Sequence, residues 1–196
     1  IKLNKMHKYK LISVLGGPAS GKGTLCTKLT NNFKSVVHIS AGDVIRSQKN
    51  LTSEFTNMMK NGSILPAQFV GNLIIQYIKE NYDTDKIILL DGFPRDQANY
   101  DYFCTEMSKY FDLICILVIE SSNCTMIERT MSRGKLSGRA DDTVETCLKR
   151  IESYYNETNK IIDLFDSVLI KRVSGEIEHE NKTYDEVVKH LNLSTE

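Results

Sequence analysis

The stretch from Val14 to Thr24, VLGGPASGKGT, constrains the fold of this chain more than any other. It carries the spacing Gly16-x-x-x-x-Gly21-Lys22 between an apolar run and a helix-forming segment. Glycines at these places let backbone N–H groups surround an anion, while the helix N-terminus and the lysine add positive charge. The position after the lysine is usually Ser or Thr but here is Gly23, so we expect the hydroxyl near a magnesium ion to be that of Thr24. The alternative is a glycine-rich turn that binds no phosphate.

Apolar runs alternate with longer amphipathic segments along the whole chain. The runs KLISVLGG, SVVHIS, KIILLDGF, LICILVIE and SVLIKRV do not alternate polar with apolar residues, which predicts strands buried on both faces. Helices are predicted over 21–33, 43–60, 66–82, 96–110, 123–135, 142–166 and about 183–192, and an exposed loop over SGEIEHENKTYDE. This order predicts an α/β fold, with a five-stranded parallel doubly wound sheet in one domain.

Composition excludes several classes of protein. Lys plus Arg and Asp plus Glu both number 25, so the basic excess typical of a nucleic-acid binder is absent. The five cysteines form no C-x-x-C pair and the four histidines have no metal-ligand spacing, which argues against a disulfide framework and a zinc site. The apolar runs LISVL and LICILVI are too short for a secretion signal or a membrane span. We therefore expect no nucleic-acid or membrane partner and a cytoplasmic protein, with a nuclear pool left open.

Charged residues follow the second and third predicted strands. After the second, Ser40 or Asp43 can cap a helix, and Arg46 on its first turn can hold a phosphate with two hydrogen bonds. After the third, Asp91 ends an apolar strand, where a carboxylate is costly to bury unless a cation or water faces it. Arg95 projects toward the same edge, unless the segment is only a tight turn with a solvated arginine. Ligands gather at this edge of a parallel sheet.

A third cluster lies in IERTMSRGKLSGRADDTVETCLKR, which carries arginines at positions 129, 133, 139 and 150. The glycine-flanked loop between them can close over a triphosphate and exclude water. The simpler interpretation is a solvated arginine face. Asp142 and Glu145 fit the D-x-x-E pattern that begins a helix.

Together, GGPASGKGT, SAGDVIR, DGFPR and RGKLSGRADD resemble the adenylate kinase superfamily of nucleoside monophosphate kinases, over roughly residues 9–193. Adenylate kinases commonly carry Thr before the Gly-Asp of the second motif and Gln four residues after the Arg of GFPR. This chain has Ala41 and Asn99 there, which looks like the UMP/CMP kinases. The resemblance implies a P-loop kinase fold with a monophosphate-binding insertion at about 40–71 and a short, zinc-free lid at about 133–142.

The resemblance also implies roles for individual residues. It places the ATP phosphates on Gly17, Ala19, Ser20, Gly21, Lys22, Gly23, Thr24 and Arg133, and the ATP base beside Arg129 and Gly175. It places the acceptor nucleotide on Ala41, Arg46, Ser63, Ile64, Leu65, Gly92, Phe93, Arg95, Asn99, Arg139 and Arg150. The catalytic set that it implies is Lys22, Asp91, Arg95, Arg133, Arg139 and Arg150.

The reaction implied is ATP with UMP or CMP giving ADP with UDP or CDP, in a monomer. Magnesium would be held mainly through the ATP phosphates and water, so no dedicated metal ligands are expected. Alternatives are an adenylate kinase that uses AMP and a non-catalytic nucleotide-binding module. A phosphate-loop GTPase is disfavoured because the chain has no N-K-x-D tetrapeptide.

Three features depart from the family pattern. Ala19 replaces the most common glycine of the loop, Leu25 replaces a frequent Gln, and the segment after Val173 is longer than usual. A methyl group at Ala19 would be strained at positive φ. We therefore expect Ala19 to have a φ below zero.

Overall fold

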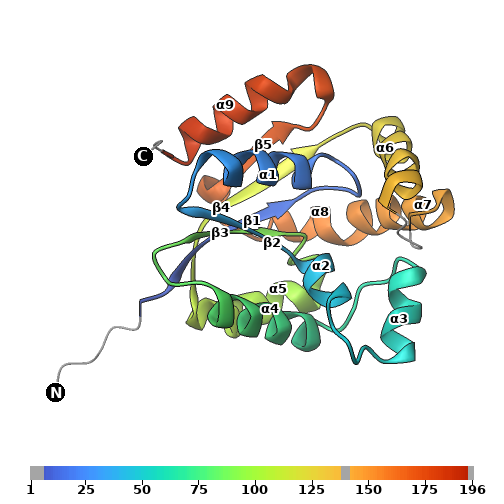
Figure 1. The fold of residues 1–196 in the computed structure, drawn as a ribbon, viewed down its shortest axis with the longest axis horizontal. Coiled ribbons are helices and arrows are strands. Elements are labelled where there is room, and N and C mark those ends of the chain that lie inside the picture. Colours follow the sequence, from blue (N-terminus) through green and yellow to red (C-terminus); the bar gives the residue numbers. More distant parts are fainter. Residues whose placement is uncertain (1–6, 138–141, 194–196) are drawn as a thin grey trace.

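Five parallel strands form the central sheet of the computed structural model, which describes residues 7–137 and 142–193 (Figure 1). Their order in the sheet is β2-β3-β1-β4-β5, so the chain first builds one side of β1 and then crosses to the other. The strands are β1 (Tyr9–Leu15), β2 (Val36–Ser40), β3 (Ile87–Asp91), β4 (Phe111–Glu120) and β5 (Ile170–Ser174). The five apolar runs of the sequence thus form the five strands of the predicted doubly wound sheet.

The two faces of the sheet bury alternate side chains of the same strands. Leu11, Ile88 and Leu90 belong to the core on one face, while Ile12 and Leu89 belong to the core on the other. All five side chains are fully buried. Successive residues of a strand point to opposite faces, so a strand covered on both sides needs a continuous apolar run.

Helices cover both faces of the sheet (Figure 1). On one face lie α1 (Lys22–Asn32) and α9 (Glu180–His190); on the other lie α2 (Ala41–Arg46), α4 (Ala67–Asn81) and α5 (Gln97–Thr105). The remaining helices are α3 (Ser53–Lys60), α6 (Asn123–Ser137), α7 (Val144–Ser153) and α8 (Asn159–Ile162). Among the described residues, no helix combines the length and apolar character needed to cross a membrane.

Two predicted helices are interrupted in the structure. The helix predicted over 43–60 is two helices, α2 and α3, because Thr52 begins α3 by accepting a hydrogen bond from the backbone N–H of Phe55. The helix predicted over 142–166 becomes α7, a π-helical turn over Tyr154–Thr158, and α8. Both segments are amphipathic in sequence, and that pattern does not reveal where a capping residue begins a new helix or where a turn widens.

The loop predicted over residues 174–186 is wrong for most of its length. After β5, a 3-10 turn over Ile177–His179 leads directly into α9 at Glu180, three residues before the predicted start. Thr183 and Val187 on α9 are buried, which gives this polar helix an inward face one turn long. The many charged residues of the segment occupy the outward face and hid that pattern.

Candidate functional site

The site lies at the carboxyl edge of the sheet, beyond the ends of β1, β2 and β3. Strand register places Asp91, the last residue of β3, beside Val14 of β1 and Ser40 of β2. The phosphate loop follows β1 directly, so one carboxylate stands between the loop and the start of α2. Parallel strands put their carboxyl ends on one edge, which explains why motifs far apart in sequence meet here.

Two cavities open at this edge and share part of their lining. One, of about 200 Å³, lies between the phosphate loop, α2 and the turn after β3. The other, of about 910 Å³, lies between α1, the start of α9 and α6. The residues that line both are Ala19, Lys22, Ser40, Asp91 and Arg133. The arrangement suits two ligands whose ends meet over Lys22.

The phosphate loop holds its lysine against its own backbone. The Lys22 ammonium donates to the carbonyl oxygens of Gly16 and Gly17, at 2.9 and 2.6 Å. Helix α1 starts beyond Gly21, whose φ is 105°, and no side chain caps it. Burial lowers the pKa of Lys22 to about 8, although the charge of Asp91 opposes that effect. A bound anion would meet the N-terminus of α1, and it would have to draw the ammonium away from these carbonyl oxygens.

Ala19 has a φ of 52°, so the expectation of a negative φ at this residue is wrong. The strain argument assumed that the backbone would adapt to the methyl group. Instead, the turn that brings successive N–H groups inward fixes the backbone, and Ala19 adopts a left-handed conformation in which an L-residue is strained. Gly16 and Gly21 in the same loop also have positive φ.

Asp91 is paired with a histidine that sequence reasoning assigned no role. His38 Nε2 of β2 lies 3.4 Å from Asp91 Oδ2. Burial opposes ionisation of Asp91, but the hydrogen bond with His38 and the charges of Lys22, His38 and Arg95 together lower its pKa. Asp91 is therefore ionised at neutral pH. The sequence offered one indication of this role, because His38 lies two residues before the end of its strand and so close to the edge where ligands bind.

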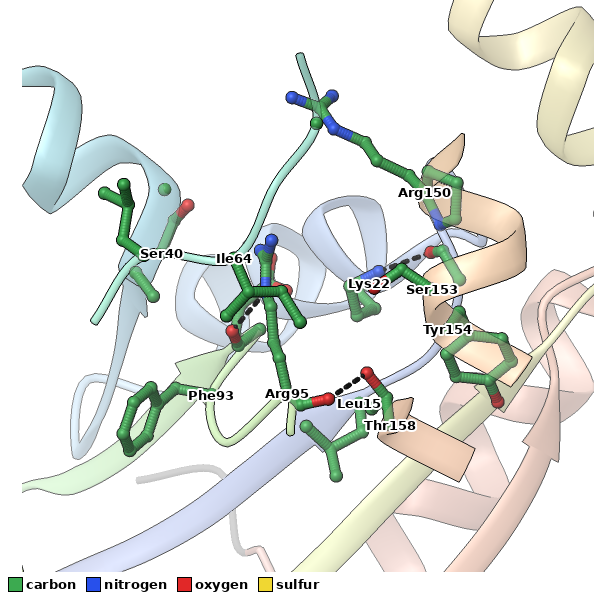
Figure 2. Close-up of a pocket in the computed structure, with 18 of the residues that line it drawn as sticks. Leu15, Lys22, Ser40, Ile64, Phe93, Arg95, Arg150, Ser153, Tyr154 and Thr158 are labelled. Carbon is green, nitrogen blue, oxygen red and sulfur yellow. Dashed lines mark hydrogen bonds between the residues drawn. The ribbon is translucent and has the colours of Figure 1, made fainter. Parts of the chain in front are cut away.

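The turn after β3 directs Arg95 into the smaller cavity (Figure 2). Arg95 Nε donates to the Gly92 carbonyl at 2.7 Å. Removal from water, together with the positive charges of Arg150 and Arg46, lowers the pKa of Arg95, whereas Asp91 raises it. Arginine nevertheless keeps its charge in proteins. The three arginines therefore act on one another across a single cavity and can attract a strongly anionic ligand.

Asp142 organises the arginines of the third cluster and does not cap a helix as predicted. Its carboxylate accepts from Arg133 Nε at 2.6 Å and from Arg133 Nη2 at 2.7 Å, and lies 3.6 Å from Arg150 Nη1. Its side chain is fully buried, so the pairing offsets the cost of burying its charge. Thr143 caps α7 instead, by accepting from the N–H of Thr146. The D-x-x-E pattern was misleading because the Asp142 carboxylate pairs with Arg133 instead of accepting from the N–H groups at the start of α7.

The larger cavity is bounded by the connection between β5 and α9. Arg129 Nη1 donates to the Gly175 carbonyl at 2.8 Å, which places the two predicted neighbours together. The carboxylate of Glu176 accepts from the Ser122 N–H and the Thr125 hydroxyl, both at 2.7 Å, and so holds the start of α6. Ile177 lines the cavity with 77% of its surface exposed, a contact that sequence analysis missed.

Asn99 provides a buried polar group that faces the smaller cavity. It lies on the first turn of α5, is 2% exposed, and lines that cavity. Its Nδ2 atom has no hydrogen-bond partner within the described chain. Buried donors are rarely left unpaired. A ligand with an acceptor at this position would satisfy it.

The structure places every predicted site residue that it describes on one of the two cavities. Ser63, Ile64 and Leu65 line the smaller cavity, and Thr24 lines the larger one. Arg139 lies outside the described residues. The predicted motifs thus converge on one edge of the sheet.

Comparisons with known proteins agree with this geometry. A family profile described as adenylate kinase matches residues 14–170. The chain is 40% identical over 167 residues to UMP-CMP kinase of Danio rerio, which covers 81% of this chain and 85% of that protein. It is 35% identical over 190 residues to UMP-CMP kinase of Sus scrofa, covering 92% and 95%. It is also 31% identical over 192 residues to adenylate kinase isoenzyme 1 of Bos taurus, covering 95% and 96%.

The strain at Ala19 predicts that Ala19→Gly stabilises the fold. Glycine adopts positive φ without the methyl clash, so we expect the free energy of unfolding in urea to rise by up to about 1 kcal/mol. Ala98→Gly is the matched control because Ala98 is an exposed residue of helix α5, and there glycine should cost about 0.5–1 kcal/mol. Equal losses in both variants would show that Ala19 is not left-handed in solution.

Proposed function

The chain belongs to the adenylate kinase family, and we propose that it transfers a phosphoryl group from ATP to UMP or CMP, giving ADP and UDP or CDP. The larger cavity is the ATP site, and the smaller is the site of the acceptor nucleotide. Residues of about 40–71 form the monophosphate-binding insertion, and about 133–142 the short lid. We further propose a cytoplasmic monomer that serves the supply of pyrimidine nucleotides.

The observation that carries the choice of acceptor is the unpaired amide of Asn99. Its buried Nδ2 donor faces the smaller cavity, and an adjacent amide oxygen can accept. Cytosine offers a ring-nitrogen acceptor beside an amino donor, and uracil offers a carbonyl acceptor beside an N–H donor. Because the amide can present either order after a flip, one Asn suits both pyrimidines. Adenine offers the same order as cytosine, so it is the shorter reach of Asn, compared with the Gln common in adenylate kinases, that favours a pyrimidine. The UMP-CMP kinases of fish and pig among the relatives support this choice.

The chemistry requires no general base, because the acceptor is already a phosphate anion. The protein must bring two highly charged groups into line and neutralise them. Arg46 and Arg95 hold the acceptor phosphate from α2 and from the turn after β3. Lys22 lines both cavities, so it can follow the transferred phosphoryl group from one nucleotide to the other.

Arg133 and Arg150 stabilise charge on the transferring group while Asp142 holds Arg133 and pairs with Arg150 beside the site. Because that carboxylate keeps the guanidinium groups in place, little reorganisation is needed when a triphosphate binds. Closure of the lid then excludes water, which would otherwise take the phosphoryl group. Arg139, on the lid, joins this set.

Magnesium is the cofactor that the family implies, and the residues present fit it. The Thr24 hydroxyl and the Asp91 carboxylate line the ATP cavity and supply the hard oxygen atoms that Mg²⁺ prefers. Among the described residues, no group of three or more His, Cys, Asp or Glu side chains could hold a metal ion. When bound, the ion neutralises phosphate charge and orients the β- and γ-phosphates.

The acceptor assay tests this proposal directly. Steady-state rates are measured with ATP and each of CMP, UMP, dCMP and AMP, and we expect kcat/KM to be highest with a pyrimidine. Asn99→Ala should lower that value by about tenfold or more while leaving the KM for ATP unchanged, because a buried hydrogen bond is lost. If AMP is clearly the best acceptor, the chain is an adenylate kinase instead. If no acceptor is phosphorylated, the non-catalytic module is the better description.

Arg95→Ala should lower kcat by about 100-fold or more with little change in the melting temperature. Within the described residues, the guanidinium donates a hydrogen bond to the nearby Gly92 carbonyl of the same turn, so the fold depends on it little. The same loss is expected for Arg139→Ala. Arg172→Ala is the control: it removes an arginine that pairs with Glu120 away from both cavities, and should keep kcat. Near-normal turnover of Arg95→Ala would remove that residue from the mechanism.

Binding of ATP should be accompanied by uptake of a proton at alkaline pH. The pKa of Lys22 is about 8 without nucleotide, and the phosphates should raise it because they favour the ammonium. ATP affinity therefore falls as pH rises above about 8, the range in which free Lys22 loses its proton. Calorimetry of MgATP binding in buffers of different ionisation enthalpy should detect uptake at about pH 9 and little at about pH 7. Lys22→Arg should abolish the difference, since arginine stays protonated; uptake that persists in this variant would assign the proton elsewhere.

A further inference from the structure

Residues 144–162 form a continuous helical segment with one widened turn. Helix α7 runs into the π-helical turn Tyr154–Thr158, which runs into α8. In a regular α-helix, a spacing of eight residues would place Thr158 about 80° around the axis from Arg150. A π-helical turn closes i→i+5 hydrogen bonds and rotates less per residue, which returns Thr158 toward the face of Arg150. Both residues line the acceptor cavity, as do Ser153 and Tyr154 between them (Figure 2).

This face of the helix contacts two parts of the site. Tyr154 lies against the phosphate loop, with its ring 3.7 Å from the position that a Cβ on Gly17 would take. One turn later, the Thr158 hydroxyl donates to the backbone carbonyl of Arg95 at 2.7 Å (Figure 2). Thr158 is 6% exposed, so water competes little for that bond.

The turn that carries Arg95 is held by several polar contacts. The Ser13 hydroxyl of β1, fully buried, donates to the Phe93 carbonyl at 2.7 Å. Arg95 fixes its own side chain on the Gly92 carbonyl. Ser13 thus holds the turn from the sheet, and Thr158 holds its far end from the helix that carries Arg150.

We propose that Thr158 is a positioning residue for Arg95, and that the π-helical turn places it so that Arg150 and Arg95 keep a fixed spacing. The inference rests on the proposed phosphoryl transfer to a nucleoside monophosphate. Thr158 acts through the Arg95 backbone, so it sets where the guanidinium meets the acceptor phosphate. Misplacement by about 1 Å can cost a reaction of this kind up to about 100-fold.

The test compares Thr158→Val, which keeps the shape but removes the hydroxyl, with Thr158→Ser, which keeps the hydroxyl. For Thr158→Val we expect kcat/KM for the pyrimidine monophosphate to fall about tenfold, as for a lost buried hydrogen bond, with the KM for ATP unchanged. Thr158→Ser should stay near the wild-type values. Equilibrium binding of CMP, measured by calorimetry, should show the same order of affinities.

Thr130→Val is the matched control. Thr130 is 1% exposed and its hydroxyl donates within α6, to the Met126 carbonyl at 2.8 Å. This variant also loses a buried hydroxyl, so it should lower the melting temperature without changing kcat/KM for the acceptor. Acceptor kinetics that are equal in Thr158→Val and Thr158→Ser, or a change in melting temperature alone, would overturn the positioning role.

Failure of the proposed function would give a different result. The wild-type protein would then prefer AMP, or would phosphorylate no monophosphate. In the first case the same three variants assayed with AMP still decide the role of Thr158. In the second, binding of CMP and AMP to the variants decides it, because equal affinities in Thr158→Val and Thr158→Ser would contradict the inference.

Discussion

The site depends on keeping several cations close together at the edge of a sheet, and two carboxylates, the half-buried Asp91 and the fully buried Asp142, offset their charges. Asp91 lies among His38, Lys22 and Arg95, and its pKa is lowered by them in spite of burial. Asp142 holds Arg133 through two hydrogen bonds and approaches Arg150. A carboxylate that lost these partners would be an uncompensated buried charge, which is strongly destabilising. Asp142 therefore fixes Arg133 before an anionic ligand arrives, while Asp91 offsets the charge of the cations around it.

The phosphate loop shows a second constraint, in which backbone geometry outweighs side-chain preference. A Cβ on Gly16 would collide with the Ile119 carbonyl of β4, and one on Gly175 with the Ser20 carbonyl of the loop itself. The loop is thus pressed between β4 and the β5–α9 connection, with little room to relax. Ala19 therefore adopts a left-handed conformation, because the surrounding backbone leaves the loop little freedom to change. Strain of this kind persists only where surrounding structure determines the backbone.

The sequence was sufficient for the parts of the molecule that depend on pattern and order. Five uninterrupted apolar runs predicted five strands, and residues placed after them predicted which motifs would meet, because a parallel sheet gathers strand ends on one edge. What could not be predicted depends on partners from distant elements. His38 and Asp142 gain their roles from Asp91 and Arg133, which lie on other elements. The helix breaks at Thr52 and Tyr154 were also hidden, since hydrophobic periodicity continues across a cap or a π-helical turn.

Most of the site is built from groups suited to phosphates, so the choice of acceptor base depends on few residues. In the proposed reaction, the cations, the phosphate loop and Asp91 act on phosphates, which every nucleotide carries, so these groups would not distinguish one base from another. Discrimination must come from a group that faces the base, and the buried Asn99 amide lies at such a place. Because adenine and cytosine offer the same order of acceptor and donor, the depth at which the amide stands has to separate a pyrimidine from a purine. Asn99 stands on the first turn of α5, four residues after Arg95. In the proposed reaction, the same short segment would hold the phosphate with one residue and read the base with the next turn, which would allow specificity to change without disturbing catalysis.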